Sequence, residues 1–189
     1  MNKNVNPTKV ITGLCTFSYL NCWEPRAAQE GGKPKYSVSL IIPKSDTKTV
    51  ARINEAIKAA YDEGMSKLKG NGKSVPALDM LHTPLRDGDK ERPDDKDYQG
   101  CWFLNATSVT APGVVDASCQ DILNHNEMYS GVKGRASINF YVYNVNGNRG
   151  IAAGLNNLQK IADGTPLGGR ARAEDDFASD LDPDEDFLA

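Results

Sequence analysis

One stretch, RASINFYVYNVNG at residues 135–147, decides the fold of this 189-residue chain. Side chains of a β-strand point alternately to its two faces, so alternate positions have to be considered separately. The even positions are all apolar: Ala136, Ile138, Phe140 and Val142. We expect this row to enter the core of the protein.

The odd positions of the same strand contain no carboxylate. They are Arg135, Ser137, Asn139, Tyr141 and Tyr143. A cation beside aromatic rings suits a single-stranded nucleic acid, because every base has a π-face and every nucleotide carries a phosphate. An ordinary surface strand with amphipathic tyrosines explains the row equally well.

A tight turn follows this strand at once. Asn146-Gly147 is the dipeptide that most readily takes up the positive φ angles of a type I′ turn. Residues 151–161 fit a returning strand, although Leu155 and Leu158 would also fit a helix. We choose a strand, because the turn requires a partner for the segment before it.

The rest of the chain indicates further strands and one long helix. Strands are expected at residues 10–20, 36–42 and 101–109, with a short one at Val114-Val115. The helix starts at an N-cap, Ser45 or Asp46, and carries an apolar stripe at helical spacing. The stripe consists of Val50, Ile53, Ile57, Ala60, Tyr61, Met65 and Leu68. Residues 21–34 are predicted to be a mobile connection, and most of residues 69–100 a solvated charged loop.

These elements predict a mainly β domain. Five main strands, a helix between the second and the third, and no βαβ repetition favour a five-stranded barrel of the OB type, a form used for oligonucleotides. We assign residues 1–172 to this domain and residues 173–189 to a separate tail.

The tail differs from the rest of the chain in charge. Residues 174–189 contain eight acids and no base, which leaves 22 basic and 17 acidic residues, a net charge of +5, in residues 1–173. Low hydrophobicity and unbalanced charge predict a disordered acidic C-terminal tail. Its role is either solubility or recruitment of a partner protein. For recruitment, the anchor would be Phe187 beside Asp184, Glu185 and Asp186.

No pattern indicates a cofactor, a metal or catalysis. The four cysteines, Cys15, Cys22, Cys101 and Cys119, lack the spacing of zinc sites, so reduced and mostly buried thiols are expected. Carboxylates gather only in the charged loop and the tail, where nothing would desolvate them, so we expect no enzyme. No apolar run could span a membrane and no signal peptide is present, which predicts a protein of the cytoplasm.

A series of short motifs resembles a known family. In chain order they are Tyr19-Leu20-Asn21, Trp23-Glu24-Pro25, residues 36–44 (YSVSLIIPK), residues 84–89 (PLRDGD), residues 112–116 (PGVVD), Tyr129-Ser130-Gly131 and residues 150–159. Their order, together with the acidic tail, resembles the single-stranded DNA-binding proteins of bacteriophages first seen in tailed phages of enterobacteria. A more distant likeness is to the replication binding protein of T7-like phages. The resemblance implies an OB fold, binding with little sequence preference, and a tail that recruits replication proteins.

We therefore predict a protein that coats and protects single-stranded DNA during phage DNA replication, recombination or repair. The residues expected to contact DNA are aromatic or basic: Tyr19, Trp23, Arg26, Lys33, Lys35, Lys133, Arg135, Tyr141, Tyr143 and Arg149. Double-stranded DNA as a second ligand and assembly into a homo-oligomer are left open. Two rival functions are a phage protein–protein interaction module, a scaffold or inhibitor with a solubilising tail, and a metal-dependent nuclease.

Overall fold

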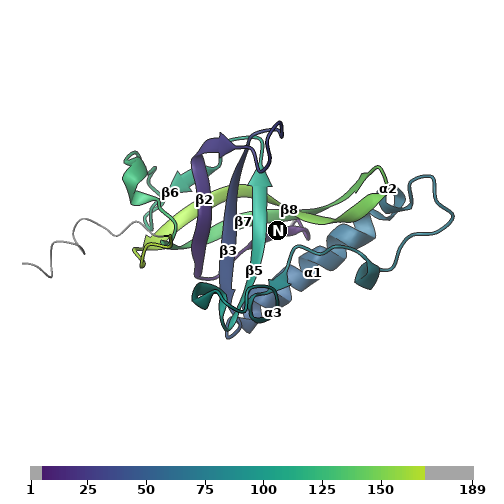
Figure 1. Ribbon diagram of the computed structural model, residues 1–189, viewed down its shortest axis with the longest axis horizontal. Helices are drawn as coiled ribbons and strands as arrows, with labels where there is room; N and C mark the ends of the chain where they lie inside the picture. The colour runs from purple at the N-terminus through teal and green to yellow at the C-terminus, as the bar shows by residue number, and fades with distance from the viewer. Residues whose placement is uncertain (1–5, 169–189) are drawn as a thin grey trace, which may run out of the picture.

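The computed structural model describes residues 6–168, in which eight strands form one sheet (Figure 1). Five long strands pair in a closed circuit, in the order β2, β3, β5, β8, β7 and back to β2. They are β2 (Cys15–Arg26), β3 (Lys35–Pro43), β5 (Cys101–Ser108), β7 (Lys133–Val145) and β8 (Asn148–Ala162). Three short strands join them: β1 (Lys9–Ile11) on β7, β4 (Arg86–Asp87) on β5 and β6 (Gly113–Val115) on β8. The mainly β prediction is confirmed.

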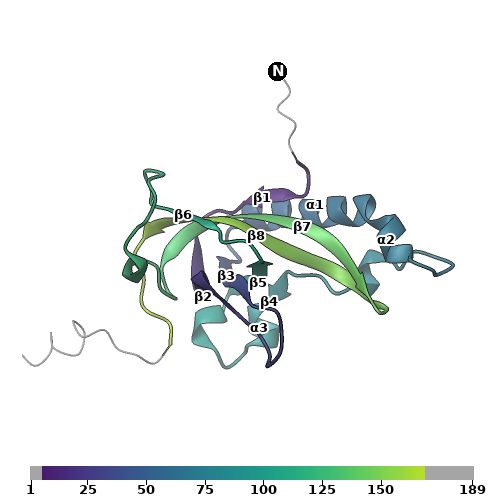
Figure 2. The ribbon, with the colours of Figure 1, turned by 90° about the horizontal axis from the view of Figure 1, so that it is seen from above.

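The predicted hairpin is the longest pairing in the sheet. β7 and β8 run antiparallel from Lys133↔Ala162 to Val145↔Asn148, so residues 151–161 form a strand and not a helix. Asn146 and Gly147 have φ angles of 51° and 84°, as a type I′ turn requires. The two strands form a long curved ribbon whose turn lies at one end of the molecule (Figure 2).

The helix predicted between the second and third main strands is also present. α1 (Thr47–Glu63) begins after Asp46, whose carboxylate accepts a hydrogen bond from the Thr49 amide at 3.1 Å. A second short helix, α2 (Met65–Lys69), follows directly. Gly64 separates the two helices at a point where a Cβ would overlap the Val142 side chain. The helix pair therefore lies closely against β7.

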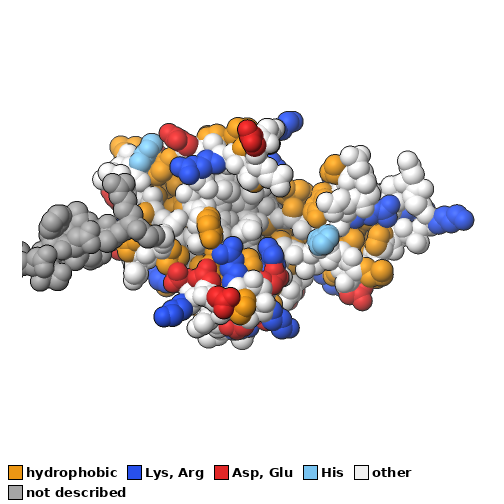
Figure 3. All heavy atoms as spheres, viewed as in Figure 1, with side chains coloured by type: hydrophobic (Ala, Val, Ile, Leu, Met, Phe, Trp, Pro, Cys, Tyr) orange, Lys and Arg blue, Asp and Glu red, His pale blue; other side chains and the backbone are white. Residues whose placement is uncertain are grey.

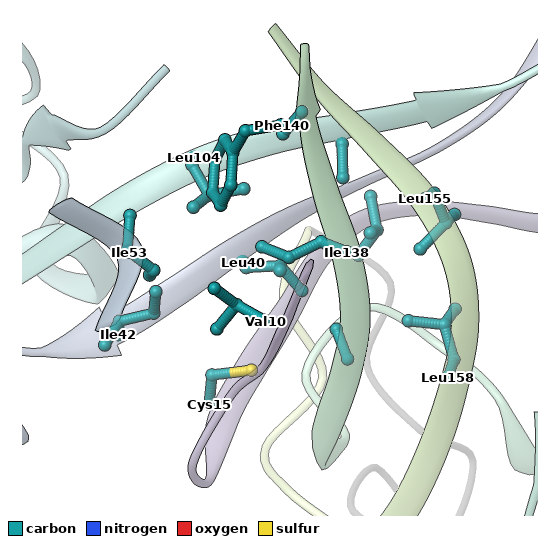
Figure 4. Packing of buried hydrophobic residues seen from close by; sticks show 14 of the residues in the cluster. Val10, Cys15, Leu40, Ile42, Ile53, Leu104, Ile138, Phe140, Leu155 and Leu158 are labelled. Atoms are coloured by element: carbon teal, nitrogen blue, oxygen red, sulfur yellow. The ribbon is translucent and has the colours of Figure 1, made fainter. Parts of the chain in front are cut away.

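The core fills the space between α1 and the circuit of strands. Side chains from β3, β5, β7, β8 and α1 meet there in one cluster (Figure 4). The even row of β7 belongs to this cluster, and Phe140 is only 2% exposed. The assignment of the two faces of β7 from the sequence is thus confirmed.

The N-terminal part of the chain departs from the prediction. Residues 10–20 are not one strand, because residues 12–14 separate β1 from β2. The expected mobile connection starts later than predicted, because β2 continues through residues 21–26 and Arg26 pairs with Lys35 on β3. Register shifts after Ser18 and Asn21 weaken the alternation of apolar and polar residues in β2, and this weak alternation concealed its length.

The charged loop is also more ordered than predicted. It contains β4, α3 (Gly88–Glu91) and the 3₁₀ turn η2 (Lys96–Tyr98). Tyr98 is 1% exposed and forms a small second core with Ile41 and Phe103 on the outer side of β3 and β5. The many charged residues of this segment predict a solvated loop. The buried side chain of Tyr98 nevertheless holds the segment against the sheet.

Two further 3₁₀ turns complete the described chain, η1 (Leu78–Met80) and η3 (His125–Glu127). Among residues 6–168, none of the helices combines the length and the apolar character that crossing a membrane requires. The predicted acidic tail, and the domain boundary at residue 172, lie outside the described residues.

Candidate nucleic-acid interface

The outer surface of β2, β3 and the loop between them is hollowed into a groove of about 770 Å³, called here the main groove. Its floor carries small polar side chains from neighbouring strands, Ser37 and Thr107. Aromatic and basic residues surround this floor: Tyr19, Arg26, Lys33 and Lys35. None of the described residues that line the groove is acidic. In Figure 3 the centre of this face is a pale hollow, with Lys and Arg side chains at its borders and Asp and Glu side chains beside them at the lower border.

A second hollow of about 730 Å³ continues the main groove toward the turn of the hairpin. Thr107 lines both, so the two meet on β5. The second hollow is bordered by Tyr143 on β7 and by Arg86 on β4. The one acidic side chain among the described residues that line it, Glu91, is paired with Arg86.

A third and smaller hollow adjoins the other end of the main groove and shares Leu20, Asn21 and Arg26 with it. Here the rings of Trp23 and His125 stack with centroids 4.1 Å apart and planes 8° from parallel. The Trp23 indole N–H also donates to the His125 carbonyl oxygen at 3.2 Å. The three hollows therefore form one continuous series across the face of the sheet.

The charged loop forms one wall of the series. Lys44 fastens the loop to the end of β3, because its ammonium lies 2.6 Å from Asp87 and 2.7 Å from Asp89. These contacts with Lys44 hold the pKa of both carboxyls below the usual range. At the other side of the loop, Arg92 reaches Tyr19 on β2 and donates to its hydroxyl at 3.2 Å.

The structure brings six of the ten predicted DNA-contacting residues to this series. Tyr19, Arg26, Lys33 and Lys35 line the main groove, Tyr143 the second hollow and Trp23 the third. The other four lie outside these linings. Tyr141 is exposed on the same side of β7 as Tyr143, and Arg149 is half-buried near Gly72.

Lys133 and Arg135 are engaged at the opposite end of β7. The Lys133 ammonium donates to the Thr16 hydroxyl, and the Arg135 guanidinium donates to the Thr12 carbonyl oxygen at 3.1 Å. Parity along a strand predicts a shared face, but β7 is 13 residues long, and neither Lys133 nor Arg135 lines any of the three hollows.

Sequence reasoning missed Arg86 and Arg92 among the residues around the hollows. Both lie in the charged loop, where the alternating charges predict side chains that point into solvent and bind nothing. The signal that could have found them is Tyr98, an aromatic residue within that polar run and close before Trp102-Phe103, which predicts an anchor for the loop.

The four cysteines form no metal site within the described residues. No cluster of three or more His, Cys, Asp or Glu side chains suited to a metal ion occurs within residues 6–168. All four thiols are free, and burial raises the pKa of Cys15 to about 12 and that of Cys22 to about 11. Both buried thiols therefore remain protonated at neutral pH.

Comparison with known proteins places the chain in a family. A family model described as the ssDNA-binding protein of Enterobacter phage Enc34 matches residues 8–188. The chain belongs to this family. A curated relative, the putative protein p50 of Acyrthosiphon pisum secondary endosymbiont phage 1, is 30% identical over 190 residues, which cover 96% of this chain and 99% of the relative.

Solved structures agree with this membership. The single-stranded DNA-binding protein of bacteriophage Enc34 in complex with ssDNA is 26% identical, with a TM-score of 0.66 and coverage of 88% of this chain and 97% of that one. A C-terminal truncation of the Enc34 protein gives a TM-score of 0.71 at 24% identity, covering 88% and 95%. The gp2.5 single-stranded DNA-binding protein of bacteriophage T7 gives 0.58 at 19% identity, covering 96% and 98%. The last two likenesses concern the fold alone.

Proposed function

We propose that this protein binds single-stranded DNA in the main groove, without chemistry and with little sequence preference. The observation that carries the proposal is the lining of the groove, where Arg26, Lys33 and Lys35 surround Tyr19 and no described lining residue is acidic. Cations neutralise phosphates and an exposed ring stacks on a base whatever the sequence. Membership of the Enc34 family supports the same ligand.

We infer that the strand follows the three joined hollows. It would pass from the Trp23–His125 pair over Arg26 and Tyr19 to Tyr143 on β7. The shared lining residues support one path and not three separate sites. The closed circuit of five strands supports the OB-type barrel expected from the sequence, whose outer face and loops suit an oligonucleotide.

We further propose that the protein coats and protects single-stranded DNA during phage DNA replication, recombination or repair, in the cytoplasm of the host cell. The acidic tail then has two roles. Eight acids and no base in residues 174–189, joined to a body of net charge +5, support competition with DNA phosphates for the groove. Phe187, beside Asp184, Glu185 and Asp186, would anchor the tail in a basic, apolar-floored pocket of a replication or recombination protein.

The proposal is tested by fluorescence anisotropy with single and double strands of equal length, each at two salt concentrations. We expect affinity for the single strand that falls with log salt at about −0.7 per phosphate neutralised. Affinity for the double strand reports whether the groove also accepts a duplex. No binding of the single strand even at low salt would contradict the proposal and favour a protein–protein interaction module.

A second measurement separates binding from chemistry. Labelled single strand is incubated with the protein and magnesium or manganese and then run on a denaturing gel. We expect an intact strand, because no metal cluster occurs within residues 6–168. Cleavage that depends on the metal would favour the nuclease.

A further inference from the structure

Tyr19 has an unusual backbone for an aromatic residue. Its φ angle is +46°, the left-handed region that large side chains rarely adopt, and it lies where the β2–β3 register shifts between Ser18 and Asn21. The side-chain amide of Asn21 donates to the Tyr19 carbonyl oxygen and to the Ser37 hydroxyl, each at 3.1 Å. These two hydrogen bonds connect the bulge to β3. The bulge turns the Tyr19 side chain outward, where it is 60% exposed.

An exposed tyrosine on a bulge would ordinarily move between rotamers, but the charged loop holds this one. The Arg92 guanidinium donates to the Tyr19 hydroxyl at 3.2 Å and lies 5.3 Å from the centre of its ring. The two residues are 73 positions apart in the chain, so the contact joins β2 to the charged loop. Arg92 therefore restrains the outer end of the ring.

Arg92 is itself well supported. Its guanidinium lies 4.5 Å from the ring centre of Tyr98 and 5.6 Å from that of Phe103, the two rings of the second core. Its only ion pair among the described residues is a long one, 3.5 Å to Asp95. A guanidinium held on two buried rings is a rigid support for a third, exposed ring.

We propose that Arg92 is a positioning residue that presents Tyr19 to the main groove as a preset stacking surface for a nucleobase. The proposal rests on the proposed function, since it deepens the same site. Fixing a side chain before binding avoids the cost of ordering it during binding, about 0.5–1.5 kcal/mol for a mobile side chain. By this account Arg92 raises affinity through Tyr19 and makes no contact with phosphate.

A double-mutant cycle tests the proposal in the full-length protein with single-stranded DNA. Tyr19→Ala should lower the affinity about five- to 150-fold, the value of one stacked base. Arg92→Gln should lower it about two- to twelve-fold, the cost of an unfixed ring. In the Tyr19→Ala background, Arg92→Gln should cause no further loss, and the slope of log affinity against log salt should stay the same.

Tyr19→Phe serves as the second variant, because it removes only an exposed hydroxyl and leaves the fold intact. It should lower the affinity about as much as Arg92→Gln. The proposal is overturned if the losses from Tyr19→Ala and Arg92→Gln multiply, since Arg92 would then act independently of Tyr19. It is also overturned if Arg92→Gln flattens the salt slope by about 0.7, since Arg92 would then contact a phosphate directly. Failure of the proposed function would look different, because the wild type itself would then not bind.

Discussion

Tyr98 stands edge-on to Phe103, with ring centroids 5.1 Å apart and ring planes at 87°. This pair fastens the charged loop to β5, and the loop in turn borders the second hollow. Tyr98→Ala should cost about 3–5 kcal/mol, as other truncations of buried rings do, and should speed hydrogen exchange in residues 86–100. Tyr98→Phe is the matched control, because it keeps the ring and loses only a long hydrogen bond to Ser39, 3.4 Å. Unchanged exchange in the Ala variant would mean that other contacts anchor the loop.

Phe140 tests the face assignment of β7. It is 2% exposed in the main core, and we expect Phe140→Ala to lower the free energy of unfolding by roughly 3–5 kcal/mol. Chemical denaturation followed by circular dichroism measures the change. A Phe140→Ala protein that is stable yet defective in DNA binding would put this ring in the groove and reverse the assignment.

A comparison of Tyr143 with Tyr141 tests whether DNA contacts the second hollow or the rest of the outer surface of β7. The sequence treats the two alike, but Tyr143 lines the hollow and Tyr141 does not. We expect Tyr143→Ala to weaken binding by about 1–3 kcal/mol for the base lost, and Tyr141→Ala to weaken it less. Anisotropy with one oligonucleotide measures both variants, and the reverse order would move the path of the strand toward the middle of β7.

The tail is tested by truncation after Ala173. Removal of eight acids should raise the affinity for single-stranded DNA, most strongly at low salt, where the attraction of the tail to the body is least screened. It should also abolish capture of a replication partner, whereas Phe187→Ala should lose the partner with little gain in DNA affinity. Equal DNA affinity of the full-length and truncated proteins at about 50 mM and about 300 mM salt, where the Debye length is roughly 14 Å and roughly 6 Å, would exclude competition.

The sequence predicts best where local chemistry and tertiary structure agree. Alternation in residues 135–145 and the Asn146-Gly147 turn identify the hairpin, and Asp46 with the apolar stripe identifies α1, because each signal is local and strong. Four groove residues, Tyr19, Arg26, Lys33 and Lys35, were found because aromatic and basic side chains gather near β2 and β3.

What the sequence could not predict depends on interactions between distant segments. The bulge at Tyr19 is invisible in the residue pattern, and Arg92 reaches it only because Tyr98 docks the charged loop on Phe103. Arg135 was predicted to contact DNA because it shares a strand face with Tyr141 and Tyr143, but parity does not say which end of a strand lies near the hollows. Lys133 and Arg135 both lie at the end of β7 where they bond Thr16 and Thr12, outside the linings of the three hollows.

The most direct test of the central claim, that the main groove binds single-stranded DNA, is the salt dependence of a charge-neutralised variant. Lys33→Gln/Lys35→Gln removes two cations from the groove, and Lys48→Gln/Lys58→Gln removes two exposed cations from α1 as the matched control. Because the groove variant neutralises two fewer phosphates, its slope of log affinity against log salt should flatten by about 1.4, and the slope of the control should stay at the wild-type value. Equal slopes for the two variants would contradict the account, because the DNA would then respond to the net charge of the protein and not to the groove.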